Sequence, residues 1–531
     1  MIFAEHMKNM DRREFLGAAA IAGAAFLAVP KTLYAAAEIP LEEATVTSLQ
    51  AAMSSGQTTA KKITQGYLAR IAKIDKTVNS IIELNPDALA IAAEMDRERK
   101  AGNVRGPLHG IPVVIKDNID TADKMKTTAG SLALADAPVP SKDAFIVSRL
   151  REAGAVLIGK TNLSEWANFR DNDSISGWSG RGGQTRNPYI LDRNPCGSSS
   201  GTGTAIAASL AAIGIGTETD GSILCPSSIC GLVGLKPTVG LVSRSGIIPI
   251  AASQDTAGPM TRSVTDAAVL LNILDFADAE DSAMNGKREK VDYTIFLKAD
   301  GLRGARIGVA RDYWGRNSVV DTVTDDALEA MKKGGAELID IKFPDLRKFG
   351  DAEFLVLQYE FKDGLEKYLR QRGSRHKTLD DLIIFNNDNA AREMPYFKQG
   401  ILESSAKLGD LSSKAYTDAI ETCRKYAREL GIDKAVNDNK LDAIVAPSNA
   451  PTWMIDTVNG DCGSGYVSSS SLAAVAGYPN ITVPAGFAKE LPIGISFFGK
   501  AWTEAALIKF AYSFEQATKA RRPPKYLATY K

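Results

Sequence analysis

Apolar residues recur with helical spacing in the first part of the chain and then form a continuous run. Those from Ile63 to Ile71 lie four residues apart and follow Thr59, which predicts a helix that begins near this threonine. Asn85-Pro86 predicts the start of a second helix, which ends at Gly102. The apolar run 111–115 then predicts a buried strand that presents Lys116 at its end.

Helical and strand patterns alternate along the rest of the chain. Helices are predicted over 147–150, 264–274, 325–333, 353–369 and 505–517, and strands over 155–159, 306–310, 336–343, 441–446 and 493–498. Such alternation is typical of α/β folds with a mixed or parallel sheet.

One stretch, Cys196–Thr238, interrupts this pattern with small and hydroxylated residues. It begins with a Ser/Gly turn, continues as a small-residue run, and reaches a second turn at residues 219–222, so we expect a compact hairpin-like unit with hydroxyls at both ends. Glycine beside serine lets the backbone approach a ligand, and successive free N–H groups form a nest for negative charge. A nucleophile and oxyanion donors are what an acyl-transfer site needs.

Such a site also needs a base, and the chain has few histidines that could act as one. The chain has three, His6, His109 and His376, and the first lies in a segment that we expect to be removed. Lys116 offers another route, because burial at the end of an apolar strand lowers a lysine pKa and allows a neutral amine to act as a base. Lys160 also follows a predicted strand, but a Gly-Lys-Thr turn more often places lysine in solvent. The pattern therefore favours a Ser/Lys hydrolase.

The segments GPLHGIPVVIKD, GSSSG and TETDGSI, the last followed by GLVGLKPT, occur in this order. Together with blocks such as SGWSGRGGQTRNPY and SQDTAGPMTRSVTDAA, they resemble the amidase signature family between Leu41 and Pro523. The resemblance implies one large α/β domain over residues 38–531, with a central mixed, mostly parallel twisted sheet flanked by helices. It also implies a serine amidohydrolase that needs no metal or organic cofactor.

The family uses a Ser-cisSer-Lys triad, and the resemblance implies a role for three residues. Lys116 matches the base, Ser198 the serine that shuttles protons, and Ser222 the nucleophile, with the cis peptide bond between Gly197 and Ser198. Each residue also has a purely structural alternative. Lys116 could extend from a strand end to solvent, Ser198 could cap the following helix, and the hydroxyl of Ser222 could bond to the backbone of its turn.

The oxyanion of the reaction is expected at four backbone N–H groups of the second turn, those of Thr219, Asp220, Gly221 and Ser222. Ser199 is expected to support the site by a hydrogen bond to Lys116 or to the backbone.

Two departures from the family pattern bear on the substrate. Family members often read GGSIR, whereas Leu224 and Cys225 occupy the region of the arginine here and cannot hold a substrate carboxylate. Asp220 in place of glycine resembles the branch of bacterial peptide amidases and aryl acylamidases, and its side chain must point away from the oxyanion site. We therefore expect neutral or apolar substrates, C-terminal peptide amides or aryl amides, with specificity set by Lys377–Asp438.

Net charge limits the expected binding partners, and cysteine content limits the expected metal sites and disulfides. The formal net charge is zero, so there is no basic footprint for nucleic acid; the expected partner is a small-molecule or short-peptide amide. The five cysteines have no metal-ligand spacing, and in a chain of this length we expect buried free thiols. The alternative is a single bridge, either Cys225–Cys230 or another pairing.

The N-terminal segment has the pattern of an export signal. The Arg12-Arg13 pair precedes an apolar run over 16–29 and the small residues 35–37, which predicts a twin-arginine signal over residues 1–37 and a periplasmic or secreted protein. The run of about 14 residues is short of the roughly 20 that cross a bilayer, so no stable membrane insertion is expected after signal removal. The alternative is an uncleaved membrane anchor.

Two rival functions are open from the sequence. Gly197–Gly201 fits the G-x-S-x-G pattern of α/β-hydrolase esterases, with Ser199 as nucleophile and His376 as the downstream histidine. That pattern needs a strand immediately before it, whereas the preceding residues predict a loop. An exported solute-binding protein without turnover is the second rival, but it has no need for Lys116, Ser198 and Ser222.

Overall fold

The computed structural model describes residues 39–284, 289–344, 346–463 and 465–530. Leu41–Lys531 form one compact unit. The predicted export signal, residues 1–37, lies outside the described residues. Every helix within the described part of the chain is too short or too polar to cross a membrane.

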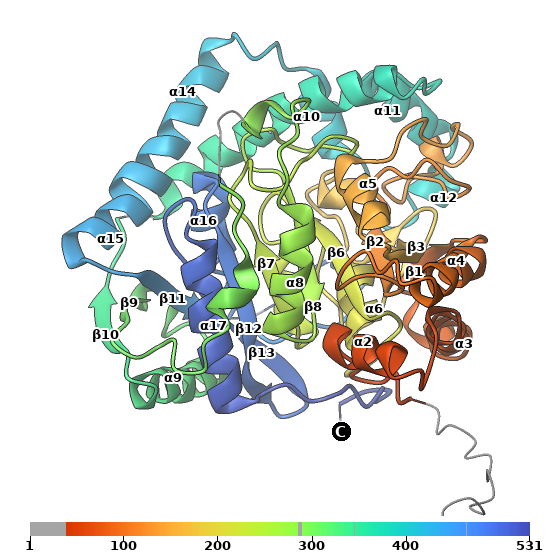
Figure 1. The fold of residues 1–531 in the computed structure, drawn as a ribbon. Helices are drawn as coiled ribbons and strands as arrows, with labels where there is room; N and C mark the ends of the chain where they lie inside the picture. The colour runs from red at the N-terminus through yellow and green to blue at the C-terminus, as the bar shows by residue number, and fades with distance from the viewer. Residues whose placement is uncertain (1–38, 285–288, 345, 464, 531) are drawn as a thin grey trace, which may run out of the picture. The chain divides into compact units, whose positions relative to one another are not determined.

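An eleven-stranded sheet forms the centre of the larger unit (Figure 1), in the order β1-β3-β2-β6-β8-β7-β12-β13-β11-β9-β10. Its strands are β1 (Ile81–Leu84), β2 (Pro112–Lys116), β3 (Val156–Thr161), β6 (Ile213–Glu218), β7 (Val233–Lys236), β8 (Thr256–Thr261), β9 (Arg306–Ala310), β10 (Glu337–Ile341), β11 (Ala443–Pro447), β12 (Asn480–Ala488) and β13 (Leu491–Phe498). Two short strands, β4 (Trp178–Ser179) and β5 (Gly183–Gln184), pair separately.

The sheet is mixed, as expected, but it is not mostly parallel. Parallel pairs occur on two flanks, where β2 joins β3 and β6, and where β9 joins β10 and β11. The run from β6 through β8, β7, β12 and β13 to β11 is antiparallel. A two-residue connection between β12 and β13 permits only antiparallel pairing, whereas a parallel pair needs a long crossover.

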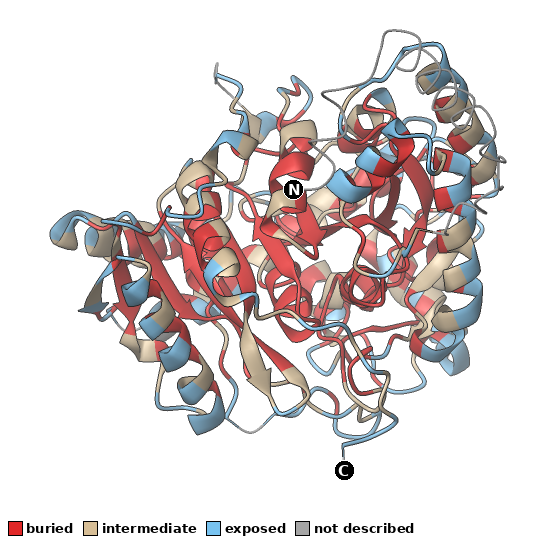
Figure 2. Ribbon diagram, turned by 60° about the horizontal axis from the view of Figure 1, so that its bottom comes forward, coloured by how far each residue is buried: buried red, intermediate tan, exposed pale blue. Residues whose placement is uncertain are grey.

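Helices flank the sheet. They are α2 (Val46–Ser54), α3 (Ala60–Val78), α4 (Ala88–Lys100), α5 (Phe145–Glu152), α6 (Ser200–Ala207), α7 (Leu224–Ile229), α8 (Val264–Leu274), α9 (Ser318–Lys333), α10 (Gly350–Gln371), α11 (Leu379–Asp388), α12 (Ala390–Glu393), α13 (Gly400–Ala406), α14 (Lys414–Cys423), α15 (Asp433–Asn439), α16 (Ser470–Ala476) and α17 (Glu504–Thr518). Helix α8 packs on β8, and α9 and α17 pack on β12. Figure 2 shows most of the sheet as buried, whereas the outer helices carry exposed faces.

The predicted elements form for the reasons that the sequence suggests. Helix α3 begins at the cap Thr59, whose hydroxyl accepts the N–H of Lys62, and its apolar stripe from Ile63 to Ile71 is buried. Strand β2 is buried at every position, as a strand inside a two-faced sheet must be. Its carboxyl end therefore places Lys116 inside the protein.

Candidate active site

Lys116 is a fully buried lysine at the end of β2. Its Nζ lies 2.7 Å from Ser198 Oγ, 2.9 Å from Thr217 Oγ1 and 3.3 Å from the Thr217 carbonyl oxygen. Burial lowers the pKa of Lys116 to about 7, and the charges of Asp255 and Glu218 limit this fall. The alternative in which the lysine extends to solvent is excluded.

The three neighbours of Lys116 satisfy both protonation states of its amine. An ammonium has three N–H donors, and here it meets three oxygen acceptors. A neutral amine has two N–H donors and one lone pair. With its donors directed at the two Thr217 oxygens, the lone pair faces the hydroxyl of Ser198, so the pair is arranged to exchange a proton.

Ser198 is held in place by its backbone and by Lys116. The peptide bond between Gly197 and Ser198 is cis, as the resemblance implied. The carbonyl oxygen of Ser198 accepts the N–H of Ser164 at 3.1 Å. Helix α6 begins after Ser199, which forms no side-chain cap. Ser198 therefore contacts the amine rather than capping the helix.

The second turn, residues 219–222, follows β6 and lies beside the Ser/Gly turn that contains Ser198. The carbonyl oxygen of Ser222 accepts the N–H of Ser199 at 3.2 Å. Gly221 has a φ of 76°, a region that glycine adopts readily and that brings successive N–H groups to one side of a turn. Among the described residues, none accepts a hydrogen bond from the backbone N–H groups of 219–222, and none bonds to the Ser222 hydroxyl. The backbone-bonded alternative for that hydroxyl is therefore not observed, and a hydrogen bond between the hydroxyls of Ser198 and Ser222 is not observed either.

Two site residues in TETDGS, Thr217 and Glu218, were missed by sequence reasoning. Thr217 binds the amine of Lys116, and Glu218 Oε2 accepts the N–H groups of Ile223 and Leu224 at 2.7 and 2.9 Å. Burial raises the pKa of Glu218, and it anchors the residues that follow Ser222. A glutamate in a buried strand that begins with isoleucine and glycine residues was the available signal.

Asp220 keeps its side chain engaged with the protein, as the sequence required. Its Oδ2 accepts the hydroxyl of Ser471 at 2.6 Å. Burial raises the pKa of this carboxyl, and hydrogen bonds from Ser470 and Ser471 oppose the rise. The backbone N–H of Asp220 thus stays available in the turn.

The expectation of free cysteines is wrong for two of the five. Cys196 and Cys225 form a disulfide, with their Cα atoms 6.0 Å apart. The alternative bridge Cys225–Cys230 is not formed, because these two residues lie near opposite ends of α7 while Cys196 passes beside Cys225. Cys230 and Cys423 are free and buried, and Cys462 is free and exposed.

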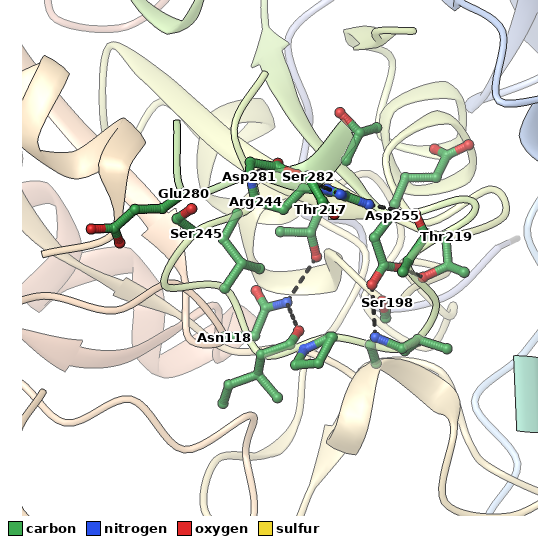
Figure 3. Close-up of a pocket in the computed structure, with 18 residues that line it drawn as sticks. Asn118, Ser198, Thr217, Thr219, Arg244, Ser245, Asp255, Glu280, Asp281 and Ser282 are labelled. Atoms are coloured by element: carbon green, nitrogen blue, oxygen red, sulfur yellow. Dashed lines mark hydrogen bonds and ion pairs between the residues drawn. The ribbon is translucent and has the colours of Figure 1, made fainter. Parts of the chain in front are cut away.

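A cavity of about 240 Å³ includes Ser198 and Thr219 in its lining (Figure 3). Residues 247–250 form an apolar wall of this cavity. Arg244 and Asp281 also line it and form an ion pair, with Arg244 Nε 2.9 Å from a carboxylate oxygen.

Asp255 lies in the same cavity and links it to the turn. One carboxylate oxygen accepts the hydroxyl of Thr219 at 2.6 Å, and the other accepts the N–H groups of Ile250 and Ala251 at 2.8 and 2.9 Å. Burial raises the pKa of Asp255 to about 6. At neutral pH it is therefore mostly an anion that acts on Lys116.

A larger cavity of about 490 Å³ lies beside the 219–222 turn. Gly197, Asp220 and Gly221 line it together with Trp453 and Tyr466. The segment Lys377–Asp438, expected to set specificity, contributes no residue to the described lining of either cavity. Half of the lining of the larger cavity comes instead from residues 453–471, which the sequence pattern did not single out.

The esterase arrangement is not present. No strand leads into Ser199, which follows a loop. Its hydroxyl donates to the Thr217 carbonyl oxygen at 3.0 Å, so Ser199 supports the site through the backbone. His376 lies near α11 and accepts a hydrogen bond from Arg375 at 2.9 Å.

Lys160 and His109 lie outside the site. Contrary to expectation, Lys160 is fully buried within β3, where its Nζ donates to the Ile119 carbonyl oxygen at 2.9 Å. Burial lowers the pKa of Lys160 to about 8. His109 is a buried histidine whose Nε2 lies 2.9 Å from the Met95 carbonyl oxygen.

The site offers an amine, hydroxyls and backbone N–H donors, the groups that acyl transfer uses. Within the described residues, His, Cys, Asp and Glu side chains form no group of three that could hold a metal ion.

Comparisons with known proteins converge on one family. The sequence model of the family described as Amidase matches residues 62–508. A probable amidase of Arabidopsis thaliana is 39% identical over 501 residues, which cover 92% of each chain. The crystal structure of peptide amidase PAM with the competitive inhibitor chymostatin is similar, with 50% identity, a TM-score of 0.88, and coverage of 92% of this chain and 100% of that one. The native peptide amidase from Stenotrophomonas maltophilia gives 49% identity, a TM-score of 0.87, and coverage of 92% and 99%.

Proposed function

This chain belongs to the amidase family and is an amidase, and on that basis we propose that it cleaves carboxamide C–N bonds through an acyl-enzyme on Ser222. Lys116 is the base and Ser198 carries protons between Lys116 and Ser222. The observation that carries this proposal is the 2.7 Å contact between the Ser198 hydroxyl and a buried amine whose pKa is about 7.

The first half of the reaction forms the acyl-enzyme. Neutral Lys116 takes a proton from Ser198, which takes one from Ser222 as the Ser222 oxygen attacks the amide carbonyl carbon. The N–H groups of residues 219–222 donate to the developing oxyanion. Loss of one such donor costs about 2.7–4 kcal/mol in other hydrolases, so the turn contributes strongly to the rate.

Departure of nitrogen and attack of water complete the cycle. Protonated Lys116 returns its proton through Ser198 to the leaving nitrogen, which otherwise would be a poor leaving group. The C–N bond breaks and ammonia or an amine departs. Water then passes a proton through Ser198 to Lys116 and attacks the ester of Ser222. Lys116 returns this proton through Ser198 to the departing Ser222 oxygen, which releases the carboxylic acid and restores the serine.

The substrate class that we propose is the C-terminal amide of a peptide with a neutral or apolar acyl side. The likeness to peptide amidases supports it. The larger cavity beside the turn, with the rings of Trp453 and Tyr466, offers room for a peptidyl chain. Leu224 is buried and Cys225 is in the disulfide, so neither position supplies a cation for a substrate carboxylate.

Hydrolysis of three substrates tests the proposal: a C-terminal peptide amide, an anilide and a short aliphatic amide. We expect the peptide amide to be hydrolysed fastest, and Ser222→Ala and Lys116→Ala to abolish turnover. A fluorophosphonate should label Ser222, and His376→Ala should leave all rates unchanged. Loss of activity in His376→Ala would instead support the esterase, and tight binding of intact amide without labelling would support a solute-binding protein.

We further propose that residues 1–37 direct export by the twin-arginine route and that the mature enzyme is periplasmic or secreted. The Arg12-Arg13 pair and the following apolar run support this. Replacement of both arginines by lysine should retain the precursor inside the cell. An unprocessed N-terminus in the exported wild-type protein, read by mass spectrometry, would indicate an uncleaved anchor.

A further inference from the structure

The disulfide joins the two segments that carry the reacting hydroxyls. Cys196 lies two residues before Ser198, and Cys225 lies three residues after Ser222. The 29 residues of sequence separation include helix α6 and strand β6. The disulfide therefore directly joins two residues that are separated in sequence by a helix and a strand.

Other direct ties between these segments are few. Between the described residues 196–200 and 219–225, the hydrogen bond recorded is that of the Ser199 N–H to the Ser222 carbonyl oxygen, at 3.2 Å. Lys116 binds both Ser198 and Thr217, which lies two residues before the 219–222 turn, and does not bond to Ser222. The hydrogen bond between Ser198 and Lys116 therefore does not by itself set the distance from Ser198 to Ser222.

The backbone conformation of Cys196 ties the position of Ser198 to the disulfide. Its φ is 59°, in the left-handed region that residues other than glycine rarely adopt. The Asn194 side chain accepts the N–H of Cys196 at 2.8 Å, and Gly197 alone separates Cys196 from Ser198. A shift of Cys196 therefore passes through two residues directly to the Ser198 side chain.

We propose that the Cys196–Cys225 disulfide is a positioning element that holds the turn of Ser198 beside the turn of Ser222, so that the two hydroxyls can come within proton-transfer distance during the reaction. This inference rests on the proposed roles of those serines. Misplacement of reacting groups by about 1 Å costs on the order of 100-fold in rate. Opening the disulfide should therefore lower the rate of acylation of Ser222 while substrate binding changes little.

Both cysteines line the larger cavity beside the turn, so a small reductant that enters the cavity meets the S–S bond. A water-soluble phosphine breaks this bond: phosphorus attacks one sulfur, the other leaves as a thiolate, and water converts the adduct to a phosphine oxide and a second thiol. The product is the same chain with two thiols and no other change.

The experiment compares oxidised enzyme, phosphine-reduced enzyme and the Cys196→Ala/Cys225→Ala variant. The readouts are the rate of fluorophosphonate labelling of Ser222, kcat and KM for a C-terminal peptide amide, and circular dichroism at the assay temperature. We expect labelling and kcat to fall by about 10- to 100-fold, with KM within about twofold and the dichroism unchanged. Reoxidation of the reduced wild-type enzyme should restore both rates.

Cys230→Ala is the matched control. Cys230 is also buried and its thiol lies 4.0 Å from the Pro195 carbonyl oxygen, so it joins the same two regions without a covalent bond. We expect its rates to match those of the wild type, with or without phosphine. Loss of folding in the double alanine variant leaves the reduced wild-type enzyme to decide.

The outcomes separate this inference from the proposed function. If oxidised wild-type enzyme is not labelled at Ser222, the proposed function fails. If it is labelled, and the disulfide-free forms are labelled within twofold of its rate, the positioning role is refuted. An equal loss in Cys230→Ala, or a loss that tracks the dichroism, would also refute it.

Discussion

The pH dependence of acylation tests the assignment of Lys116 most directly. Only the neutral amine can accept a proton, so the rate should rise as pH increases through the pKa of Lys116, which is about 7. The neutral fraction is then about 9% at pH 6 and about 91% at pH 8, a tenfold rise that levels off above pH 8. A solvent-exposed lysine would give a rise that continues beyond pH 10.

Asp255→Asn provides the perturbation. The Asp255 carboxylate raises the pKa of Lys116, so neutralising Asp255 should lower that pKa. The rising part of the pH–rate profile, called the limb below, should then move to more acidic pH. Asparagine has the same shape and can still bind Thr219 and the N–H groups of Ile250 and Ala251. The relative rate at pH 6 should increase, with a ceiling of about 11-fold, when the neutral fraction rises from about 9% towards completion.

The assay is the second-order rate of fluorophosphonate labelling of Ser222 between pH 5 and 10, normalised to the plateau of each enzyme. This rate reports acylation without the later steps. The reasoning is refuted if the wild-type limb lies above pH 9, or if the Asp255→Asn limb is unmoved or shifts to higher pH. Asp461→Asn, which changes a carboxylate in the other cavity, is the control and should leave the limb in place.

Four further outcomes are expected. Lys116→Met should gain stability relative to the wild type as pH falls from 10.5 to 7, because the pKa of Lys116 in the folded protein lies below its value in the unfolded chain. The full gain is on the order of 5 kcal/mol, and the hydrogen bonds lost in the variant offset part of it. Denaturant unfolding at both pH values measures this difference. Gly221→Ala places a side chain at a φ of 76°, which should cost about 1–2 kcal/mol in stability and lower kcat more than it changes KM. Glu218→Gln removes a buried anionic acceptor from the N–H groups of Ile223 and Leu224, which follow Ser222, so kcat should fall about tenfold or more; the thermal midpoint reports any structural loss. Loss of the Cys196–Cys225 bond should lower the free energy of unfolding by about 3.6 kcal/mol, from a sequence separation of 29 residues; unchanged urea midpoints would contradict the loop-entropy argument.

Much of the fold follows from local patterns. Helix α8 and strand β9 have the bounds that periodicity predicts, and the apolar run before Lys116 is a buried strand. These features depend on residues within a few positions of one another, which is why a single sequence encodes them. The antiparallel centre of the sheet depends on which strands pair, and only short connections such as that between β12 and β13 reveal it locally.

For the site, local sequence specifies the chemical groups: a lysine at the end of a buried strand, a serine in a Ser/Gly turn, and a second serine after a glycine that permits a nest of N–H donors. Long-range contacts determine how these groups meet. Thr217 reaches Lys116 across 101 positions of sequence, and Cys196 pairs with Cys225 rather than remaining free. Such contacts arise because the sheet and its loops bring distant segments together, and no local spacing specifies which side chains then touch.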